Sequence, residues 1–251
     1  MSAIVLLVGG FGNLGGRIAA HLSQFQNHQI VLASRKKQAA PLWAKEAQTI
    51  QLDVTDPTTF SNIPKSVNCI VQLAATNDVD SAQNPERARS VTTEGTASLL
   101  NAAIHNGIER FVYFSTAHVY GAPLQGMFTE SSTTHAVHPY ATTHLEAESV
   151  VAAAHENRDI QGIRVRLSNG FGRPMAYEAA DWRTLTSDLC RQAVIERRME
   201  MRTDGLQERN FITKTDIARA VQHLIALPVS QKSDGLFNLG CLLYTSDAAD
   251  E

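Results

Sequence analysis

Six short apolar runs, each separated from the next by a segment too long for a hairpin, constrain the fold of this chain more than any other feature. They span residues 3–8, 29–33, 49–52, 69–73, 110–114 and 162–167. Continuous aliphatic and β-branched runs of this length are typical of strands buried on both faces of a parallel sheet. Helical periodicity at 13–25, 85–105 and 140–156 fits the crossover connections that such a sheet requires. The sequence therefore predicts an α/β fold with a doubly wound parallel sheet.

The remaining segments follow this alternation less regularly. The polar stretch at 34–48 is predicted to be helical. Beyond Gly170 the pattern predicts helices over 182–198 and 213–227, and short strands at 210–212 and 236–239. We therefore expect a sheet domain at 1–169. A small, truncated annex on the substrate side would occupy 170–240, with its final strand returning to the sheet.

The last eleven residues, from Cys241 to Glu251, need a separate interpretation. Their sequence, CLLYTSDAADE, matches one reading frame of a common transposase-based sequencing adapter and has neither a helical nor a strand period. We expect 241–251 to be a non-native tail, comparable to a fusion scar, so that the annex would lack its closing helices. A genuine polar C-terminus is the alternative.

Composition and charge exclude several classes of function. Apolar residues make up 43% of the 251 residues and charged residues 19%, an ordinary balance for a globular domain. The net charge is −3, but three acids lie in the last five residues, and the rest of the chain carries 22 charges of each sign. Such a surface offers no footprint for nucleic acid or an anionic membrane.

The three cysteines and the first apolar run bear on the compartment. None of the cysteines has CxxC or metal-ligand spacing, which indicates a reducing environment. The run at 3–8 is too short to span a membrane, and no basic segment precedes it. We therefore expect a cytoplasmic protein.

A glycine-rich segment directly follows the first run and opens the first helix. Gly9 would allow a tight turn, Gly12 would let the backbone approach a diphosphate, and Gly15 would let helix and strand pack closely. The helix N-terminus would offer free N–H groups and a partial positive charge to phosphate. A glycine turn without a ligand is the alternative. This context predicts the dinucleotide-binding loop of a Rossmann fold, formed by Gly9, Gly10, Phe11, Gly12, Asn13, Leu14 and Gly15.

The end of the second run bears on which dinucleotide is bound. An acidic residue there would accept a hydrogen bond from the ribose 2′-hydroxyl and repel a 2′-phosphate, but this chain has Ser34, Arg35 and Lys36. We expect NADP to be preferred, with NAD possible; two solvated cations are the alternative. Asp53 and Val54, after the third run, are placed to accept a hydrogen bond from the adenine amino group.

Taken together, the motifs of this chain resemble the extended short-chain dehydrogenases/reductases of the NAD(P)-dependent epimerase/dehydratase family, from about Ala3 to Gly240. Several of the motifs are weak alone, whereas their order and spacing are specific. The motifs are residues 9–15, 53–54, 72–75, 95–96, 114–121, 139–140, 166–169, 209–212 and 237–240. The resemblance implies an NAD(P)-binding domain at 1–169, with Leu73, Ala74 and Ala75 also at the cofactor.

The resemblance also implies a hydride-transfer site. Thr116 and Tyr140 would share the substrate hydroxyl, and Tyr140 would move its proton as acid or base while hydride passes to or from nicotinamide. Asn169 would shape the substrate pocket, and Arg209 would clamp a phosphate or carboxylate. A turn-stabilising asparagine and a surface arginine are the alternatives for these two.

His144 departs from the family pattern, which places a lysine one turn after the tyrosine to hold the nicotinamide ribose and lower the tyrosine pKa. Its spacing is right, because residues i and i+4 share a helix face. A cation about 4 Å away at an effective dielectric of about 20 contributes ~4 kcal/mol, or about three pKa units. A mostly neutral histidine supplies little of this. Either His144 bonds to the ribose in a site of altered catalysis, or it caps the ribose in a protein with little turnover.

Two classes of function stay open. The first is an NAD(P)-dependent epimerase, dehydratase or reductase that acts on a nucleotide sugar or a small carbonyl or hydroxyl substrate. The second is a catalytically weak or inactive NADP-binding sensor that presents a face to another protein. His135, His138 and His144 lack the carboxylate partners of a metal site, so we expect no metal. A small-molecule substrate is expected, and a homodimer remains open.

Overall fold

A parallel sheet forms the centre of the computed structural model, which describes residues 3–201, 204, 209–228 and 233–240. Its strand order is β3-β2-β1-β4-β5-β6-β9, and every neighbouring pair is parallel. The doubly wound sheet predicted from the apolar runs is therefore confirmed. The strands are β1 (Ala3–Val8), β2 (His28–Ser34), β3 (Gln48–Gln51), β4 (Cys69–Gln72), β5 (Arg110–Thr116), β6 (Gln161–Leu167) and β9 (Leu236–Leu239).

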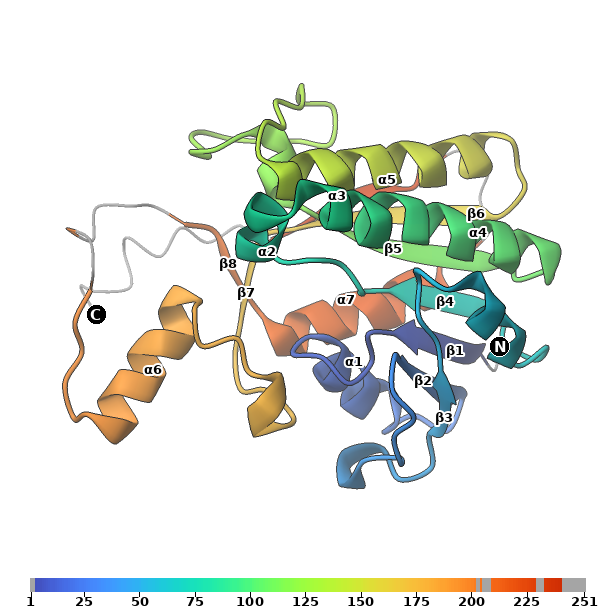
Figure 1. The fold of residues 1–251 in the computed structure, drawn as a ribbon, viewed down its shortest axis with the longest axis horizontal. Helices are drawn as coiled ribbons and strands as arrows, with labels where there is room; N and C mark the ends of the chain where they lie inside the picture. Colours follow the sequence, from blue (N-terminus) through green and yellow to red (C-terminus); the bar gives the residue numbers. More distant parts are fainter. Residues whose placement is uncertain (1–2, 202–203, 205–208, 229–232, 241–251) are drawn as a thin grey trace.

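Helices cover both faces of this sheet (Figure 1). On one face, α1 (Gly15–Leu22) packs beside α7 (Lys214–Ala226); on the other lie α4 (Gly95–His105) and α5 (Pro139–Glu156). Successive residues of a strand pack alternately against the helices on one face of the sheet and on the other. In β1, Val5 and Leu7 join the core with α1 and α7, whereas Leu6 and Val8 join the core with α4 and α5.

The connections between strands differ from the predicted pattern in two places. The helix predicted over 34–48 is wrong: the segment forms only a 3₁₀ turn, η1 (Leu42–Ala44), because a single buried residue, Ala44, anchors it and Pro41 precedes the turn. Between β4 and β5 the chain forms α2 (Asp78–Gln83), α3 (Pro85–Ala88), a π-helical turn η3 (Arg89–Glu94) and then α4. Other short 3₁₀ turns are η2 (Pro57–Asn62), η4 (Ala117–Tyr120) and η5 (Tyr177–Ala179).

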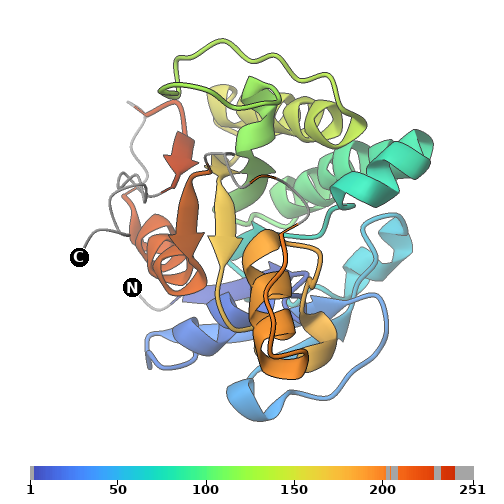
Figure 2. The same cartoon turned by 90° about the vertical axis from the view of Figure 1, so that its left-hand side faces the viewer.

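The segments after β6 lie mostly beyond the edge where the strands end, the side that Figure 2 presents to the viewer. They include the paired strands β7 (Asn169–Phe171) and β8 (Phe211–Thr213), and α6 (Leu185–Ile195). β9 then pairs with β6, and α7 lies against α1. The tail predicted to be non-native, 241–251, lies outside the described residues. Over the part of the chain that the structure describes, no helix is long and apolar enough to cross a bilayer.

Candidate active site

The glycine-rich loop joins the end of β1 to α1 in the geometry that a phosphate site needs. Gly9 has a φ of +91°, a backbone conformation that residues with a side chain rarely adopt. A Cβ on Gly15 would lie 2.2 Å from the Gly9 carbonyl oxygen, so only glycine lets the helix approach the turn. Leu14, the residue before α1, makes no side-chain capping bond, and the first turn contains no acid. The N-terminus of α1 therefore keeps its positive end for an anion.

The predicted cofactor residues that follow β4 lie against this loop. A Cβ on Gly9 would be 3.2 Å from the Ala74 backbone nitrogen and 3.3 Å from the Leu73 carbonyl carbon. Ala75 continues the same edge and is exposed. Leu73 and Ala74 thus lie beside the glycine loop, between β1 and β4, where an open α/β sheet changes direction and generally binds its ligand.

The other end of the predicted cofactor site gathers at the ends of β2 and β3. Asp53 accepts hydrogen bonds from the Thr55 backbone nitrogen (2.9 Å) and hydroxyl (2.7 Å). Burial raises the pKa of Asp53, but these bonds and the nearby Arg35 outweigh it, and the net pKa is lowered. Ser34 is partly exposed, accepts from Gln38 Nε2 at 3.0 Å and donates to the Lys36 carbonyl. Arg35 and Lys36 are exposed.

The three predicted catalytic residues come together where β5 ends and α5 begins. Thr116 ends β5 and is buried, and its hydroxyl accepts from the His118 backbone nitrogen at 3.2 Å. The Tyr140 and His144 rings meet edge to face, with centroids 4.7 Å apart. Burial raises the pKa of Tyr140; the nearby Thr116 hydroxyl opposes that rise, and the charge of Asp78 adds to it. The phenol is therefore held protonated near neutral pH.

His144 is neutral, and its tautomer follows from its partner. Its side chain is buried, which lowers its pKa to about 3. Tyr113 Oη on β5 lies 2.7 Å from His144 Nδ1, and His144 Nε2 has no partner within the described structure. If the tyrosine donates, only one buried donor, Nε2–H, remains unpaired; if the histidine donates, both the tyrosine hydrogen and Nε2 remain unpaired. We therefore assign the proton to Nε2, as a donor without a protein acceptor.

A buried ion pair fixes the helix that carries these groups. Glu148 lies one turn beyond His144 and accepts from Arg166 Nη2 at 2.7 Å and from Arg166 Nε at 3.0 and 3.1 Å. Ser115 Oγ donates to the same carboxylate at 2.5 Å. The Arg166 guanidinium also lies over the Tyr120 ring, 4.8 Å from its centroid. These contacts join α5 to β5 and β6 directly behind the candidate catalytic side chains.

A further polar side chain, that of His118, lies near Tyr140. The rings of His118, in η4, and Tyr140 have centroids 6.3 Å apart. Burial lowers the pKa of His118, the charges of Arg209 and His138 lower it further, and Asp78 raises it. Arg209 therefore lies close enough to act electrostatically on this region. The Asn169 side-chain nitrogen donates to the Asn210 carbonyl at 2.9 Å, which joins β7 to the start of β8.

A segment beyond β7, residues 172–183, connects the two sides of the crevice. Met175 Sδ lies 3.6 Å from Arg17 Nη1 on α1. Arg183 Nη1 donates to Asn77 Oδ1, 3.2 Å away, at the start of α2. α1 follows β1 and α2 follows β4, so this segment crosses the sheet edge at its change of direction.

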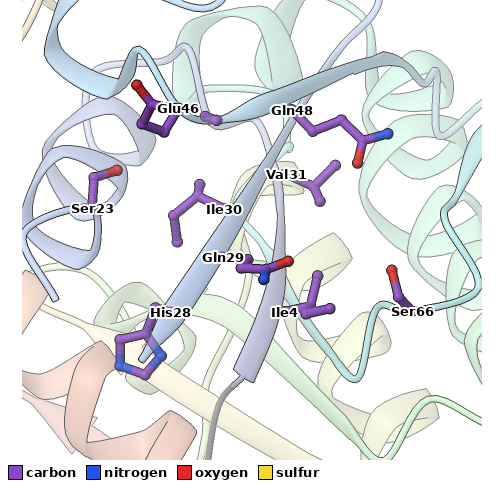
Figure 3. Close-up of a pocket in the computed structure, with 10 residues that line it drawn as sticks. Ile4, Ser23, His28, Gln29, Ile30, Val31, Glu46, Gln48 and Ser66 are labelled. Atoms are coloured by element: carbon purple, nitrogen blue, oxygen red, sulfur yellow. The ribbon is translucent and has the colours of Figure 1, made fainter. Parts of the chain in front are cut away.

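A separate pocket lies at the opposite edge of the sheet, where β1, β2 and β3 begin (Figure 3). His28, Gln29 and Ile30 line it along β2, and Ser66 faces it from the connection before β4. The glycine loop follows the carboxyl end of β1, so this pocket is remote from the candidate catalytic groups.

The comparisons with known proteins agree with this geometry. A family model described as the NAD dependent epimerase/dehydratase family matches residues 5–240. The chain belongs to this family. Low-salt glycan biosynthesis protein Agl12 of Haloferax volcanii is 30% identical over 176 residues, which cover 67% of this chain and 57% of that protein. dTDP-D-glucose 4,6-dehydratase of Mus musculus is 29% identical over 227 residues, which cover 86% of this chain and 62% of that protein.

Solved structures of epimerases and dehydratases share the fold. UDP-glucose 4-epimerase of Thermotoga maritima, solved with UDP-glucose, superposes with a TM-score of 0.81 at 18% identity, over 94% of this chain and 76% of that one. The resemblance expected from the motifs is therefore confirmed, as is the Rossmann fold. The chain spans less than two thirds of the length of the two curated relatives named above.

The arrangement fits the nicotinamide dinucleotide that the family name implies. The glycine loop leaves a helix N-terminus open to a diphosphate, and Nε2–H of His144 is a buried donor without an acceptor. Sequence patterns did not identify three polar residues near the site: Asp78, His118 and Lys214. Of these, His118 could have been suspected from its place two residues after Thr116, whereas the other two are recognised only from their contacts.

Proposed function

We propose that this protein oxidises and re-reduces a nucleotide sugar at one hydroxyl-bearing carbon, the step that nucleotide-sugar epimerases and dehydratases have in common. The observation that carries the proposal is the convergence of Thr116, Tyr140 and His144 at the sheet edge that also carries the glycine loop. The names of the relatives support the substrate class: the mouse relative is a dTDP-D-glucose dehydratase, and the Thermotoga structure holds UDP-glucose. A bound nicotinamide dinucleotide would accept and return the hydride.

Each of the chain's own residues has a task in this step. Tyr140, as tyrosinate, takes the proton of the substrate hydroxyl while the carbon–hydrogen bond gives up hydride, and a keto sugar results. On return, the phenol gives the proton back to the oxygen. The Thr116 hydroxyl holds the same oxygen, and His144 Nε2–H would donate to a ribose hydroxyl of a bound dinucleotide. Arg209 attracts the diphosphate of the nucleotide sugar from the side of His118.

A panel of UDP- and dTDP-linked hexoses, incubated with the protein and either dinucleotide, tests this function. We expect at least one sugar to be converted to an isomer of equal mass, as in an epimerase, or to a product lighter by one water, as in a dehydratase. Mass spectrometry separates the two masses, and proton NMR identifies the inverted carbon. A protein that binds dinucleotide but leaves every sugar unchanged would contradict the proposal.

One observation favours a second function, that of a dinucleotide-binding module with little turnover. His144 is uncharged, with a pKa lowered to about 3, so position 144 supplies no cation to assist the ionisation of Tyr140. Such a module would bind dinucleotide with the same loop and present its surface to another protein. It is distinguished by a His144→Lys variant that remains as inactive as the parent.

We further propose that NADP binds more tightly than NAD. Arg35 and Lys36 are exposed at the end of β2, and no acid lies in the run from Ser34 to Gln38. A 2′-phosphate would meet these cations, whereas an adenosine 2′-hydroxyl would find no carboxylate there. The solved structure of the related-fold protein MoeE5 holds NAD, so the choice between the two dinucleotides needs its own test.

Arg35→Asp is expected to reverse this preference. The lost arginine–phosphate contact and the added negative charge should weaken NADPH binding by roughly 10- to 100-fold, while NADH binding stays equal or improves. Titration of nicotinamide fluorescence measures both affinities. Lys65→Asp makes the same charge change at an exposed lysine before β4 and should change neither. Equal affinities for NADPH and NADH in the parent protein would refute the preference.

A further inference from the structure

Lys214, the first residue of α7, is a buried cation that the proposed mechanism does not use. Its side chain is 4% exposed. The ammonium nitrogen lies 2.5 Å from Asn13 Oδ1 and 2.8 Å from the Gly172 carbonyl oxygen. Both acceptors are uncharged. The first belongs to the phosphate loop, 201 residues away in the sequence, and the second to the segment that follows β7.

The charges around Lys214 do not neutralise it. Among the described residues, none of the carboxylates forms an ion pair with its ammonium group within 4.0 Å. Asp181 attracts it from a greater distance, but both oxygens of Asp181 are already bonded to Arg183, at 2.9 and 3.0 Å. Arg17, in the first turn of α1, repels it. Burial is the largest influence and lowers the pKa of Lys214 to about 8.

A buried cation without a paired anion destabilises a folded protein, unless an anion binds beside it. Lys214 lies next to the part of the molecule that is built for an anion. It holds the side chain of Asn13, which directly precedes Leu14 at the open N-terminus of α1. Arg17 adds a second positive charge to the same corner. Helix terminus, arginine and lysine therefore create one region of positive potential around the glycine loop.

We propose that Lys214 is a positioning residue of the diphosphate subsite: it fixes Asn13, and with it the phosphate loop, and its charge is balanced by the dinucleotide diphosphate. The inference rests on the dinucleotide site of the proposed function and adds a residue to it. The proposal also explains why a charged residue is buried here. A neutral side chain would pack at this place without the cost of burying a charge, so the charge itself must have a function. Within the part of the chain that the structure describes, the Lys214 ammonium bonds to Asn13 and Gly172 and not to Tyr140, so it does not replace the lysine that the family pattern places at position 144.

The proposal predicts a particular pH dependence of binding. Below about pH 8 the ammonium group is charged in the free protein, and above it the proton is lost. Because a bound diphosphate favours the charged form, the affinity for NAD should decline as the pH rises through 8. The other charged groups facing Lys214 are Arg17 on α1 and Asp181 in the 172–183 segment, and the hydrogen bond with Arg183 lowers the pKa of Asp181.

Calorimetric titration of the parent, Lys214→Met and Lys214→Arg proteins with NAD and with adenosine tests the inference. Lys214→Met should weaken NAD binding about tenfold, leave adenosine binding unchanged and remove the alkaline decline, and Lys214→Arg should restore most of the affinity. The melting temperature of the unliganded Met variant should change little, because removal of an unpaired buried charge offsets the loss of its two hydrogen bonds. Arg219→Met, which removes an exposed cation of the same helix, should leave all these values unchanged.

Three results would overturn the inference. One is NAD binding that is equal in the parent and Met proteins. Another is equal weakening of NAD and adenosine together with a lower melting temperature, which would mean a structural role only. The third is a parent affinity that does not change between pH 7 and 9. A parent protein that binds neither NAD nor NADP would instead reject the dinucleotide site itself, and so is distinguishable from a failure at Lys214.

Discussion

Replacing Tyr140 by phenylalanine is expected to lower turnover by on the order of 10²- to 10⁴-fold, while the affinity for dinucleotide stays at the parent value. The change removes only the hydroxyl that accepts and returns the substrate proton. The ring remains, so its edge-to-face contact with His144 is kept, and the glycine loop is untouched. Initial rates with the best sugar of the panel, beside fluorescence titration with NADPH, measure the two quantities.

Tyr177→Phe is the matched control for this prediction. Tyr177 lies in η5 and is 66% exposed, so the same chemical change there should alter neither rate nor affinity. Undiminished turnover in the Tyr140→Phe protein would show that another group moves the proton. His118 would then be the first residue to test, because its ring lies 6.3 Å from that of Tyr140.

Replacing His144 by lysine is expected to raise turnover near neutral pH and to shift the alkaline rise of the rate to lower pH. In the parent protein, burial raises the pKa of Tyr140, so the tyrosinate fraction is small at pH 7 and grows with pH. A lysine ammonium within about 4 Å would favour the tyrosinate by up to about three pKa units. The pH–rate profile should therefore move toward neutrality by as much as that amount.

His144→Gln separates the effect of charge from that of shape. Glutamine can donate a hydrogen bond but carries no charge, so its profile should keep the alkaline position of the parent. Thermal unfolding, measured for all three proteins, shows whether each variant is folded. A lysine profile that coincides with that of glutamine would mean that position 144 does not act on the Tyr140 pKa, and the catalytic placement would be wrong.

The partner of His144 adds a condition to the lysine experiment. Tyr113 Oη is buried and bonds to His144 Nδ1. A lysine at 144 that reaches toward the cofactor would leave this hydroxyl without its acceptor, which costs about 1–3 kcal/mol. Tyr113→Phe combined with His144→Lys removes the unpaired group. The double variant should therefore be more stable than the single lysine variant.

The sheet and the phosphate loop were predictable because their signals are local. A buried parallel strand has to be apolar on both faces, and β1, with burial on both sides of the sheet, shows this in its sequence AIVLLV. Gly9 and Gly15 were likewise predictable, since both follow from the turn between a strand and a helix. The predicted helix at 34–48 failed because polar composition was read as helical propensity in a segment that has almost nothing to bury.

Contacts between distant segments were beyond the reach of such signals. Tyr140 and His144 could be placed on one helix face by spacing, but the Tyr113 hydroxyl beside them lies on a strand read only as a core element. Lys214 looks like an ordinary polar residue at the start of a helix. Lys214 is buried because α7, which directly follows β8, begins against the glycine loop. No pattern within either segment indicates that contact.

The 172–183 segment has a consequence for how long a cofactor stays bound. A dinucleotide in the crevice between β1 and β4 would lie beneath a bridge held to α1 through Met175 and to α2 through Arg183. Release would first require this bridge to lift, which adds a conformational step to dissociation. An enzyme that removes hydride from a sugar and returns it to the same sugar gains from such slow exchange, because the reduced dinucleotide does not dissociate between the two half-reactions. The dinucleotide would then behave as a resident prosthetic group that co-purifies with the protein, and not as a second substrate drawn from solution in every cycle.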